Sequence, residues 1–227
     1  MNNINDDNYD PDNMDNYHDV DDMMEAVTGD APKDAIVVEV TGHQFAWEFR
    51  YPGADKVLGK TNFKLYTAKN NLGVDFDDPA SRDDIHVNTT MHIPVGIPVK
   101  MVIHAQDVIH DVGLSHFRLK MDAVPGIPTT LWFTPKYTTK EMKELTGNPD
   151  FVYEISCDQM CGNGHYSMKG IIEVVDQEEY DVWQAKQKPQ YLVTHPDKDP
   201  SNAKPAADTT KMAAKPVEAP AKPAEKM

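Results

Sequence analysis

The stretch Cys157-Asp-Gln-Met-Cys161-Gly-Asn-Gly-His165-Tyr-Ser-Met168 organises the rest of this chain. It places two thiols, an imidazole and the thioether of Met168 close together in the sequence. Thiolate and thioether are soft donors and imidazole is intermediate, so this mixture suits copper better than calcium or magnesium. Zinc accepts Cys and His but has little use for the thioether of Met168. Because its two glycines allow tight turns, the stretch is expected to form a loop around an ion rather than a helix.

Other uses of these cysteines are weaker matches, and the chain has only these two. A Cys157–Cys161 disulfide would close a very short loop and add little stability. A thioredoxin-like dithiol has two intervening residues, whereas this pair has three. A zinc site would need a distant fourth ligand. A mononuclear blue copper site needs only one Cys. Two thiolates that bridge two coppers use the whole inventory, provided that a second His comes from elsewhere.

Two further motifs make the pattern specific. The segment Asp107-Val-Ile-His110 is followed by Lys120-Met-Asp-Ala-Val-Pro-Gly126. Together with Cys-x3-Cys-x3-His-x2-Met, these motifs resemble the soluble binuclear copper (CuA) domain of cytochrome c oxidase subunit II of the bacterial type. The resemblance runs from about Ala35 to Trp183.

The resemblance implies a ligand set, residue by residue. Cys157 and Cys161 would bridge both coppers, His110 and Met168 would complete one copper, and His165 and the backbone carbonyl of Gln159 would complete the other. The family usually has Glu at position 159, where the side chain also helps to bind magnesium at the contact with subunit I. The copper ligand is a carbonyl, so Gln159 preserves it, but a neutral amide is a weaker ligand for magnesium.

An aromatic segment, His43-Gln-Phe45-Ala-Trp47, resembles the Gly-His-Gln-Trp-x-Trp segment of the family. There the first Trp is the proposed entry point for electrons from cytochrome c. Phe45 stands at that position and presents a smaller aromatic surface, while Trp47 matches the second Trp. We hypothesise that the electron donor docks differently here, as a cytochrome held within a larger respiratory assembly (a supercomplex). Packing in the core is the alternative; it is favoured for Trp47 and left open for Phe45.

Three regions are expected along the chain. Residues 1–34 are acidic and contain no Lys or Arg before Lys33, so they are expected to be disordered or loosely draped. Residues 35–188 are expected to form the copper domain. Residues 189–227 are rich in Lys, Ala and Pro and are expected to form a disordered tail.

Many short strand-like runs separated by turn residues predict an all-β sandwich or barrel. Val99, Met101 and Ile103 alternate with other residues, which indicates a half-buried strand. Thr138 with Glu141 and Asp176 with Glu179 are helix-start signals. The family resemblance sharpens the expectation to a cupredoxin-like Greek-key sandwich with short peripheral helices. His104 and His116 match no family ligand, whereas Asp111 is expected to influence the site from beside His110.

The formal net charge of -15 argues against nucleic acid as a partner and favours a basic one. No apolar run approaches the roughly 18 to 20 residues that span a bilayer, and no secretory signal is recognisable. The family normally carries a transmembrane hairpin before the copper domain. We therefore expect either a soluble fragment or a hairpin on another chain.

The resemblance implies an electron-transfer subunit of a haem-copper terminal oxidase, an oxidoreductase of the respiratory chain. A c-type cytochrome would give electrons to the binuclear copper, which would pass them to haem in subunit I for reduction of oxygen to water. This chain would lack the oxygen-reducing site. Its expected location is the periplasmic face of a bacterial inner-membrane complex, against subunit I and other membrane subunits. A copper-delivery or storage protein is the rival. A nitrous oxide reductase would need a large further domain, and a quinol oxidase subunit lacks the cysteines.

Overall fold

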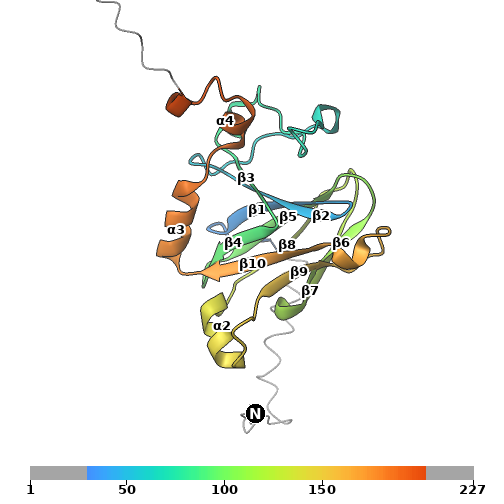
Figure 1. The fold of residues 1–227 in the computed structure, drawn as a ribbon, viewed down its shortest axis with the longest axis vertical. Coiled ribbons are helices and arrows are strands. Elements are labelled where there is room, and N and C mark those ends of the chain that lie inside the picture. The colour runs from blue at the N-terminus through green and yellow to red at the C-terminus, as the bar shows by residue number, and fades with distance from the viewer. Residues whose placement is uncertain (1–29, 203–227) are drawn as a thin grey trace, which may run out of the picture.

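Ten strands form two five-stranded sheets in residues 30–202, the part of the chain that the computed structural model describes (Figure 1). The first sheet has the order β3-β2-β1-β5-β8 and the second has the order β4-β10-β9-β6-β7. The strands are β1 (Ile36–His43), β2 (Ala46–Tyr51), β3 (Ile85–Asn88), β4 (Thr90–Pro94), β5 (Val99–Ala105), β6 (His110–Leu114), β7 (Leu119–Ala123), β8 (Thr129–Phe133), β9 (Tyr153–Cys157) and β10 (Lys169–Val175).

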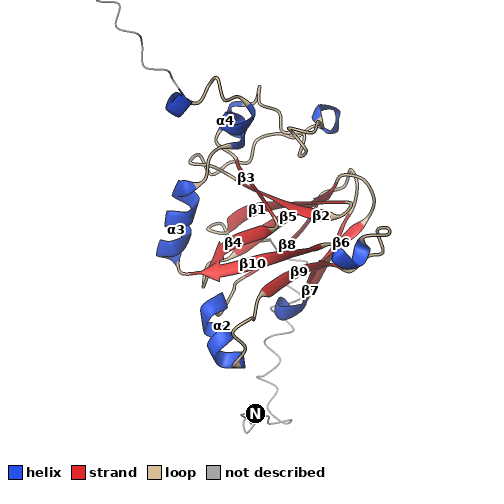
Figure 2. Cartoon of the chain, viewed as in Figure 1, coloured by secondary structure: helices blue, strands red, loops and turns tan. Residues whose placement is uncertain are grey.

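The core lies between the two sheets. Along β5, Val99, Met101 and Ile103 are fully buried, as the alternating pattern predicted. Ile155 of β9 and Val174 of β10 belong to the same apolar cluster from the second sheet. Burying a side chain of this size contributes about 1.5–3 kcal/mol. Figure 2 shows the two sheets with short helices at their periphery, which confirms the expected all-β sandwich.

Each sheet contains one parallel pair among antiparallel ones. β1 pairs in parallel with β5, with Ile36 opposite Val99, and β4 pairs in parallel with β10. Strands that pair in parallel need a connection that crosses over. The chain between β1 and β5 therefore forms β2, a long connection over residues 52–84, and then β3 and β4. This arrangement places β1 at the centre of the first sheet.

In the described part of the chain, three α-helices lie at the periphery: α2 (Thr139–Thr146), α3 (Gln177–Lys186) and α4 (Gln190–Thr194). The predicted capping box at α2 is present, because Thr138 and Glu141 exchange hydrogen bonds there. The helix ends at Gly147, which has a left-handed backbone. α3 begins after Asp176 as predicted, although the Asp176 side chain makes no capping hydrogen bond.

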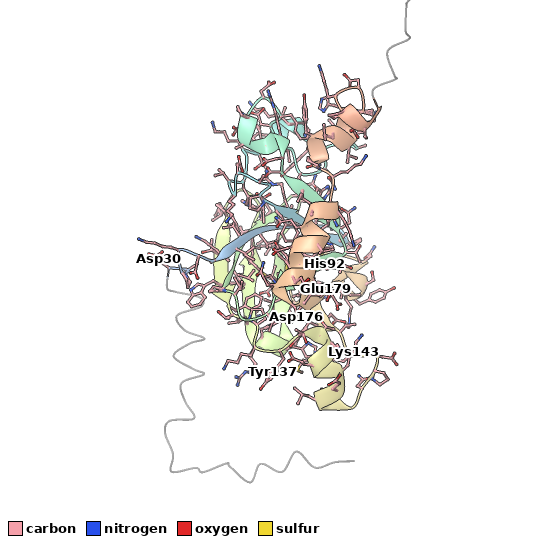
Figure 3. All side chains as sticks on the ribbon, turned by 90° about the vertical axis from the view of Figure 1, so that its left-hand side faces the viewer. Asp30, His92, Tyr137, Lys143, Asp176 and Glu179 are labelled. Carbon is pink, nitrogen blue, oxygen red and sulfur yellow. The ribbon has the colours of Figure 1, made fainter. Side chains whose placement is uncertain are left out.

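α3 packs against one end of the sandwich. The Trp183 ring lies edge-on to Tyr51, with ring centres 5.2 Å apart, and stacks on His92 of β4 at 4.5 Å. Figure 3 shows His92 beside this helix, with Glu179 nearby. Burial lowers the pKa of His92, despite the opposing effect of Glu179. In Figure 1 this helix lies at the end of the sandwich opposite the loop between β9 and β10.

The division at residues 34 and 188 stays a prediction, since residues 1–29 and 203–227 lie outside the described part. Within the segment assigned to the tail, α4 follows a bridge between Pro189 and Ile85. The Gln190 N–H also donates to the carbonyl of Asp84 at 2.8 Å. No helix within residues 30–202 is both long and apolar enough to cross a membrane.

A buried charged group lies on the first sheet, on the face turned away from the core. Arg50 of β2 donates from Nε to Glu39 of β1, and from Nη1 to Asp84 at 2.7 Å and to the Gly59 carbonyl at 2.9 Å. Arg50 and Glu39 are 2% and 5% exposed, and Asp84 is fully buried. We call Glu39, Arg50 and Asp84 the Arg50 cluster.

The two carboxyls of the Arg50 cluster respond differently to burial. Burial tends to raise the pKa of Glu39, but hydrogen bonds from His104 and Arg50 outweigh it and lower the pKa to about 2. For Asp84, burial outweighs the attraction of Arg50 and raises the pKa to about 6. One Asp84 oxygen has no hydrogen-bond partner, which fits that result.

Candidate metal centre

The loop between β9 and β10 carries most of the predicted ligands. Cys157 ends β9, and its N–H donates to the carbonyl of Met168 at 3.1 Å, so the two ends of the loop are tied together. A 3-10 helix from His165 to Ser167 forms its second half. The stretch is thus a loop, as the glycines predicted, and it returns to the sheet beside the place where it left.

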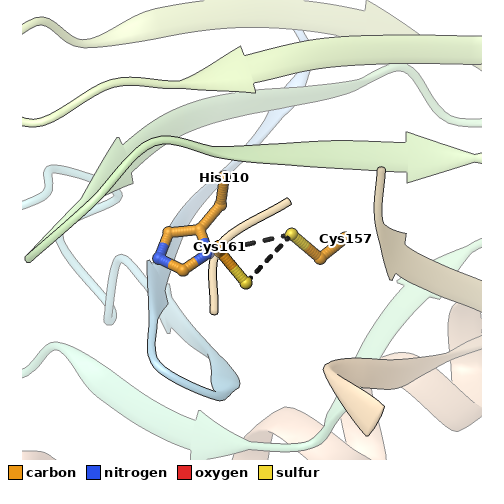
Figure 4. A group of neighbouring side chains, drawn as sticks. All are labelled: His110, Cys157 and Cys161. Atoms are coloured by element: carbon orange, nitrogen blue, oxygen red, sulfur yellow. Dashed lines mark hydrogen bonds between the residues drawn. The ribbon is translucent and has the colours of Figure 1, made fainter. Parts of the chain in front are cut away.

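β6 supplies the distant imidazole. Val112 of β6 pairs with Cys157 of β9, so His110 at the start of β6 lies beside the loop. His110 Nδ1 lies 3.7 Å from Cys157 Sγ, and the two sulfurs of Cys157 and Cys161 are 3.7 Å apart (Figure 4). Among residues 30–202, these three form the one group of three or more His, Cys, Asp or Glu residues whose ligand atoms all lie within 4.8 Å of one another.

The remaining predicted ligands surround the same sulfurs. His165 Nδ1 lies 3.6 Å from Cys161 Sγ, and Met168 Sδ lies 3.9 Å from it. The Gln159 carbonyl oxygen lies 3.1 Å from Cys157 Sγ. The structure therefore brings all six predicted residues to one place, with a different imidazole next to each sulfur.

The centre is largely shielded from water. His110 and Met168 are fully buried, Cys157 and Cys161 are 6% and 4% exposed, and His165 is half-buried. Both cysteines are free thiols. Burial, together with the neighbouring Cys157, raises the pKa of the Cys161 thiol to about 11. A metal that binds here would have to displace that proton.

Asp107 orients the buried imidazole. Its Oδ1 lies 2.8 Å from Nε2 of His110, the nitrogen that faces away from the sulfurs. Burial tends to raise the pKa of Asp107, but the hydrogen bonds from His110, Gln44 and Val108 outweigh it and lower the pKa. A carboxylate on the outer nitrogen fixes the orientation of an imidazole ligand and makes it more basic. Sequence reasoning used Asp107 only as part of a motif; its position three residues before His110 was the available signal.

The aromatic pair of the β1–β2 turn lies next to the centre. Trp47 is 1% exposed and its ring lies edge-on to His110, with ring centres 6.0 Å apart. Phe45 is 36% exposed, and its ring lies so close to Gly162 and Gly164 that a β-carbon at Gly164 would be 2.5 Å from it. Trp47 thus packs in the core, as favoured, while Phe45 borders both the loop and the solvent.

Sequence reasoning missed Gln44, which precedes Phe45 in the chain and contacts both segments that carry the predicted ligands. The Gln44 side chain donates from Nε2 to the Cys161 carbonyl at 2.6 Å, and its backbone N–H donates to Asp107 Oδ2 at 2.8 Å. The two hydrogen bonds join residues far apart in the chain. No local pattern in the sequence reports such contacts.

Asp111, His104 and His116 lie outside the group of converging donors. Asp111 is 2% exposed, and because side chains alternate along a strand it faces away from the side of β6 that carries His110. Burial and the neighbouring Asp122 raise the pKa of Asp111 to about 6. His104 lies 3.2 Å from Glu39, and His116 packs edge-on against Phe151.

The donor set fits a soft metal ion. Thiolate, thioether and imidazole together are the ligands that copper takes in proteins. A metal–sulfur bond of about 2.3 Å is longer than half the 3.7 Å between the two sulfurs. An ion can therefore contact both sulfurs at once. The nearest imidazole nitrogens approach the sulfurs through Nδ1, and Asp107 holds the opposite nitrogen of His110.

Comparisons with known proteins show which proteins the chain is similar to. Residues 36–175 match the family described as "Cytochrome C oxidase subunit II, periplasmic domain". The chain is 35% identical over 158 residues to the alternative cytochrome c oxidase subunit 2 of Bradyrhizobium diazoefficiens, a match that covers 69% of this chain and 53% of that protein. It is 31% identical over 170 residues to cytochrome c oxidase subunit 2 of Thermostichus vulcanus, covering 75% of this chain and 38% of that protein.

A solved structure is also similar. It is the periplasmic domain of subunit II of cytochrome oxidase from Bradyrhizobium japonicum, with 24% identity, coverage of 69% of this chain and 95% of that chain, and a TM-score of 0.47. The chain spans about half, or less, of the length of the curated relatives named above. Since the family match covers most of the described residues, the chain belongs to the cytochrome c oxidase subunit II family, as the periplasmic domain of that subunit.

Proposed function

We propose that this chain is the electron-entry domain of a haem-copper terminal oxidase. In this proposal a binuclear copper centre accepts electrons from a c-type cytochrome and passes them to haem in subunit I, where oxygen is reduced to water. The chain would carry electrons but not reduce oxygen itself. The names of the relatives, which are subunits of cytochrome c oxidases, support this proposal.

One observation carries the binuclear form of the proposal: each of the two neighbouring sulfurs has its own imidazole. His110 lies beside Cys157, and His165 lies beside Cys161. A mononuclear blue copper site takes two imidazoles, one thiolate and a thioether, so it would leave one of the two thiols without a role. With two ions, His110 and Met168 would complete one copper, while His165 and the Gln159 carbonyl would complete the other.

The protein around the centre has three tasks in this proposal. The buried sulfurs and His110 exclude water from the site, which limits the solvent rearrangement that accompanies a change of charge. Asp107 holds His110 in one orientation. The strands β6 and β9 fix the two halves of the ligand set relative to one another through their pairing. Bound copper would supply the redox change, and two thiolates shared between two ions would spread it.

The side chain of Gln159 is exposed, so it is free to face another subunit. We expect a weaker magnesium site there than a glutamate would give, because a neutral amide lacks the charge that a hard cation prefers. Adding magnesium to the assembled oxidase and measuring bound magnesium per complex, before and after Gln159→Glu, tests this point.

The proposed partners follow from family membership and charge. Subunit I and further membrane subunits would hold the domain on the periplasmic face of a bacterial inner membrane. The net charge of -15 suits a basic c-type cytochrome as the donor. Phe45, in place of the larger aromatic, supports a donor held within a supercomplex. A stopped-flow measurement of electron transfer from a reduced basic cytochrome, repeated at rising salt, would show a falling rate if charge steers this donor.

The test of the metal centre is copper loading followed by copper counting, visible spectroscopy and electron paramagnetic resonance. We expect two coppers per chain, thiolate charge-transfer bands, and one unpaired electron shared by both ions. Cys157→Ser should abolish the shared-electron spectrum, whereas Ser156→Ala, one residue earlier on β9, should preserve it. One copper per chain, or a cuprous site that resists mild oxidation, would instead favour a blue copper or copper-delivery protein.

A further inference from the structure

The turn between β1 and β2 crosses from the first sheet to the metal loop of the second sheet. Its central residue, Gln44, makes two hydrogen bonds that nothing in the ligand motif predicts. The side-chain amide donates to the carbonyl of Cys161 at 2.6 Å, and the backbone N–H donates to Asp107 at 2.8 Å. One residue therefore contacts both segments that supply ligands.

The contact with Cys161 fixes a point where the loop backbone is otherwise free to rotate. Gly162 follows with φ of +140°, a conformation that only glycine adopts readily. A β-carbon at Gly162 would lie 2.9 Å from Nε2 of Gln44, so the absence of a side chain there makes room for the amide. The hydrogen bond from Gln44 therefore holds the Cys161 carbonyl directly before Gly162, a residue type with wide conformational freedom.

The contact with Asp107 leads to the other half of the ligand set. Asp107 uses Oδ2 for the N–H of Gln44 and Oδ1 for Nε2 of His110, at 2.8 Å in both cases. A displacement of Gln44 would therefore disturb the carboxylate that orients His110 as well as the backbone that carries Cys161. Second-layer contacts of this kind commonly tune metal affinity and potential.

We propose that Gln44, from the first sheet, is a positioning residue that keeps Cys161 and His110 of the second sheet in register with one another. The inference rests on the proposed function, because register between the two ligands matters most when two ions share two thiolates. Gln44 holds Cys161 through its side chain and His110 through Asp107. Loss of the side-chain bond would displace Cys161, one of the two thiolates that would bridge the ions, so the ions would no longer share it equally.

Two variants and one control test this role. Gln44→Glu keeps the shape but turns a carboxylate toward the Cys161 carbonyl, and Gln44→Met keeps the length but has no donor. Both leave the backbone N–H that binds Asp107. Gln187→Glu is the matched control, since the Gln187 amide also donates to a main-chain carbonyl, that of Trp183 at 3.1 Å, away from the metal loop.

The first measurement uses copper-free, reduced protein. The rate at which a maleimide alkylates Cys161 is followed by peptide mass spectrometry, with melting curves to confirm folding. Removing a hydrogen bond to a buried group should raise the population of locally open loop by about five- to ten-fold. We expect that increase for Gln44→Met and at least as much for Gln44→Glu. If Gln44→Glu does not fold, Gln44→Met decides the result.

The second measurement uses copper-loaded protein. We expect the wild-type chain to show hyperfine splitting from two equivalent coppers, the Gln44 variants to show splitting dominated by one copper, and the control to match the wild type. Unchanged alkylation and unchanged splitting in both Gln44 variants would overturn the inference. A wild-type chain without a two-copper spectrum would overturn the proposed function instead, and the alkylation rates would still decide the role of Gln44.

Discussion

Two buried polar groups in this domain differ in how their members satisfy one another. In the Arg50 cluster a guanidinium donates to two carboxylates and a carbonyl, so the positive charge is fully matched. In the metal centre, the nearest polar neighbours of Cys161 Sγ are another sulfur, an imidazole nitrogen and a thioether, all at 3.6–3.9 Å. Those donors contact one another, and the Asp107 carboxylate of the centre lies on the outer nitrogen of His110, away from the sulfurs.

The difference separates a structural group from a ligand site. Buried charges that are paired and hydrogen-bonded need nothing further, whereas a set of converging soft donors is completed by a metal. Removing one member should therefore have opposite consequences in the two groups. A change in the Arg50 cluster should lower the stability of the protein and leave copper binding intact. A change in the metal centre should abolish copper binding and have little effect on the stability of the copper-free protein.

The largest expected effect is on the Arg50 cluster. Arg50→Met leaves Glu39 and Asp84 buried without their cation, which should lower the free energy of unfolding by about 3–5 kcal/mol. Urea unfolding of the copper-free protein measures it. Lys169→Met is the control, because the Lys169–Glu154 pair at 2.8 Å is exposed on both sides and should contribute no more than about 1 kcal/mol. An Arg50→Met domain as stable as this control would contradict a structural role for the cluster.

The next effect concerns the metal centre. A ligand that binds only the folded state stabilises it by about 2.7 kcal/mol at a hundred times its dissociation constant. Copper should therefore raise the melting temperature of the wild-type chain. Cys161→Ser should remove most of that gain while changing the melting temperature of the copper-free protein little. Differential scanning calorimetry with and without copper measures both. A large loss in the copper-free Cys161→Ser variant would erase the contrast with the Arg50 cluster.

The two groups also differ in how well the sequence predicts them. The ligands of the metal centre lie in motifs with fixed spacing, and the structure brings His110, Cys157 and Cys161 together. The strand alternation in β5 and the Thr138–Glu141 capping box were likewise readable, because both depend on neighbouring residues. The Arg50 cluster was not predicted. The connection over residues 52–84, which supplies Gly59 and Asp84 to Arg50, carries no periodic pattern.

The contacts of Gln44 show the same limit at the metal centre itself. Which residues converge at the candidate metal centre was indicated by the family motifs, but what holds those residues depends on how one sheet packs on the other. The β1–β2 turn meets the metal loop only through that packing. Sequence therefore predicted the donors that converge and not the residues that support them.

Asp111, on the outer face of the second sheet, can be compared with the carboxyls of the Arg50 cluster. It is a buried carboxyl whose charge is only partly balanced by a cation and by hydrogen bonds. Lys120 Nζ lies 3.6 Å away, and one Asp111 oxygen has no hydrogen-bond partner. Its pKa is raised from 3.8 to about 6. A carboxyl with a raised folded-state pKa favours the folded state at low pH, and that contribution is lost as the pH rises from about 4 through 6.

Asp111→Asn should remove this pH dependence. Between pH 4 and pH 7, the stability of the wild-type copper-free protein should fall relative to the variant by on the order of 2 kcal/mol. Urea unfolding at a series of pH values measures the difference. Asp84, with a pKa of about 6, is present in both proteins, so its contribution cancels. Parallel curves for the two proteins would show that Lys120 compensates Asp111 fully.

The smallest expected effect concerns Phe45, which lies between the metal loop and the solvent and belongs to neither buried group. At 36% exposed, it offers a partner only part of its ring. Phe45→Trp enlarges that aromatic surface and should raise the rate of electron transfer from a soluble cytochrome by less than ten-fold, equivalent to about 1.4 kcal/mol or less. Phe63→Trp, at a 72% exposed position on the connection over residues 52–84, is the control. Stopped-flow rates that rise equally in both variants would reflect added surface in general, and an unchanged rate in Phe45→Trp would remove the argument for a donor that docks differently.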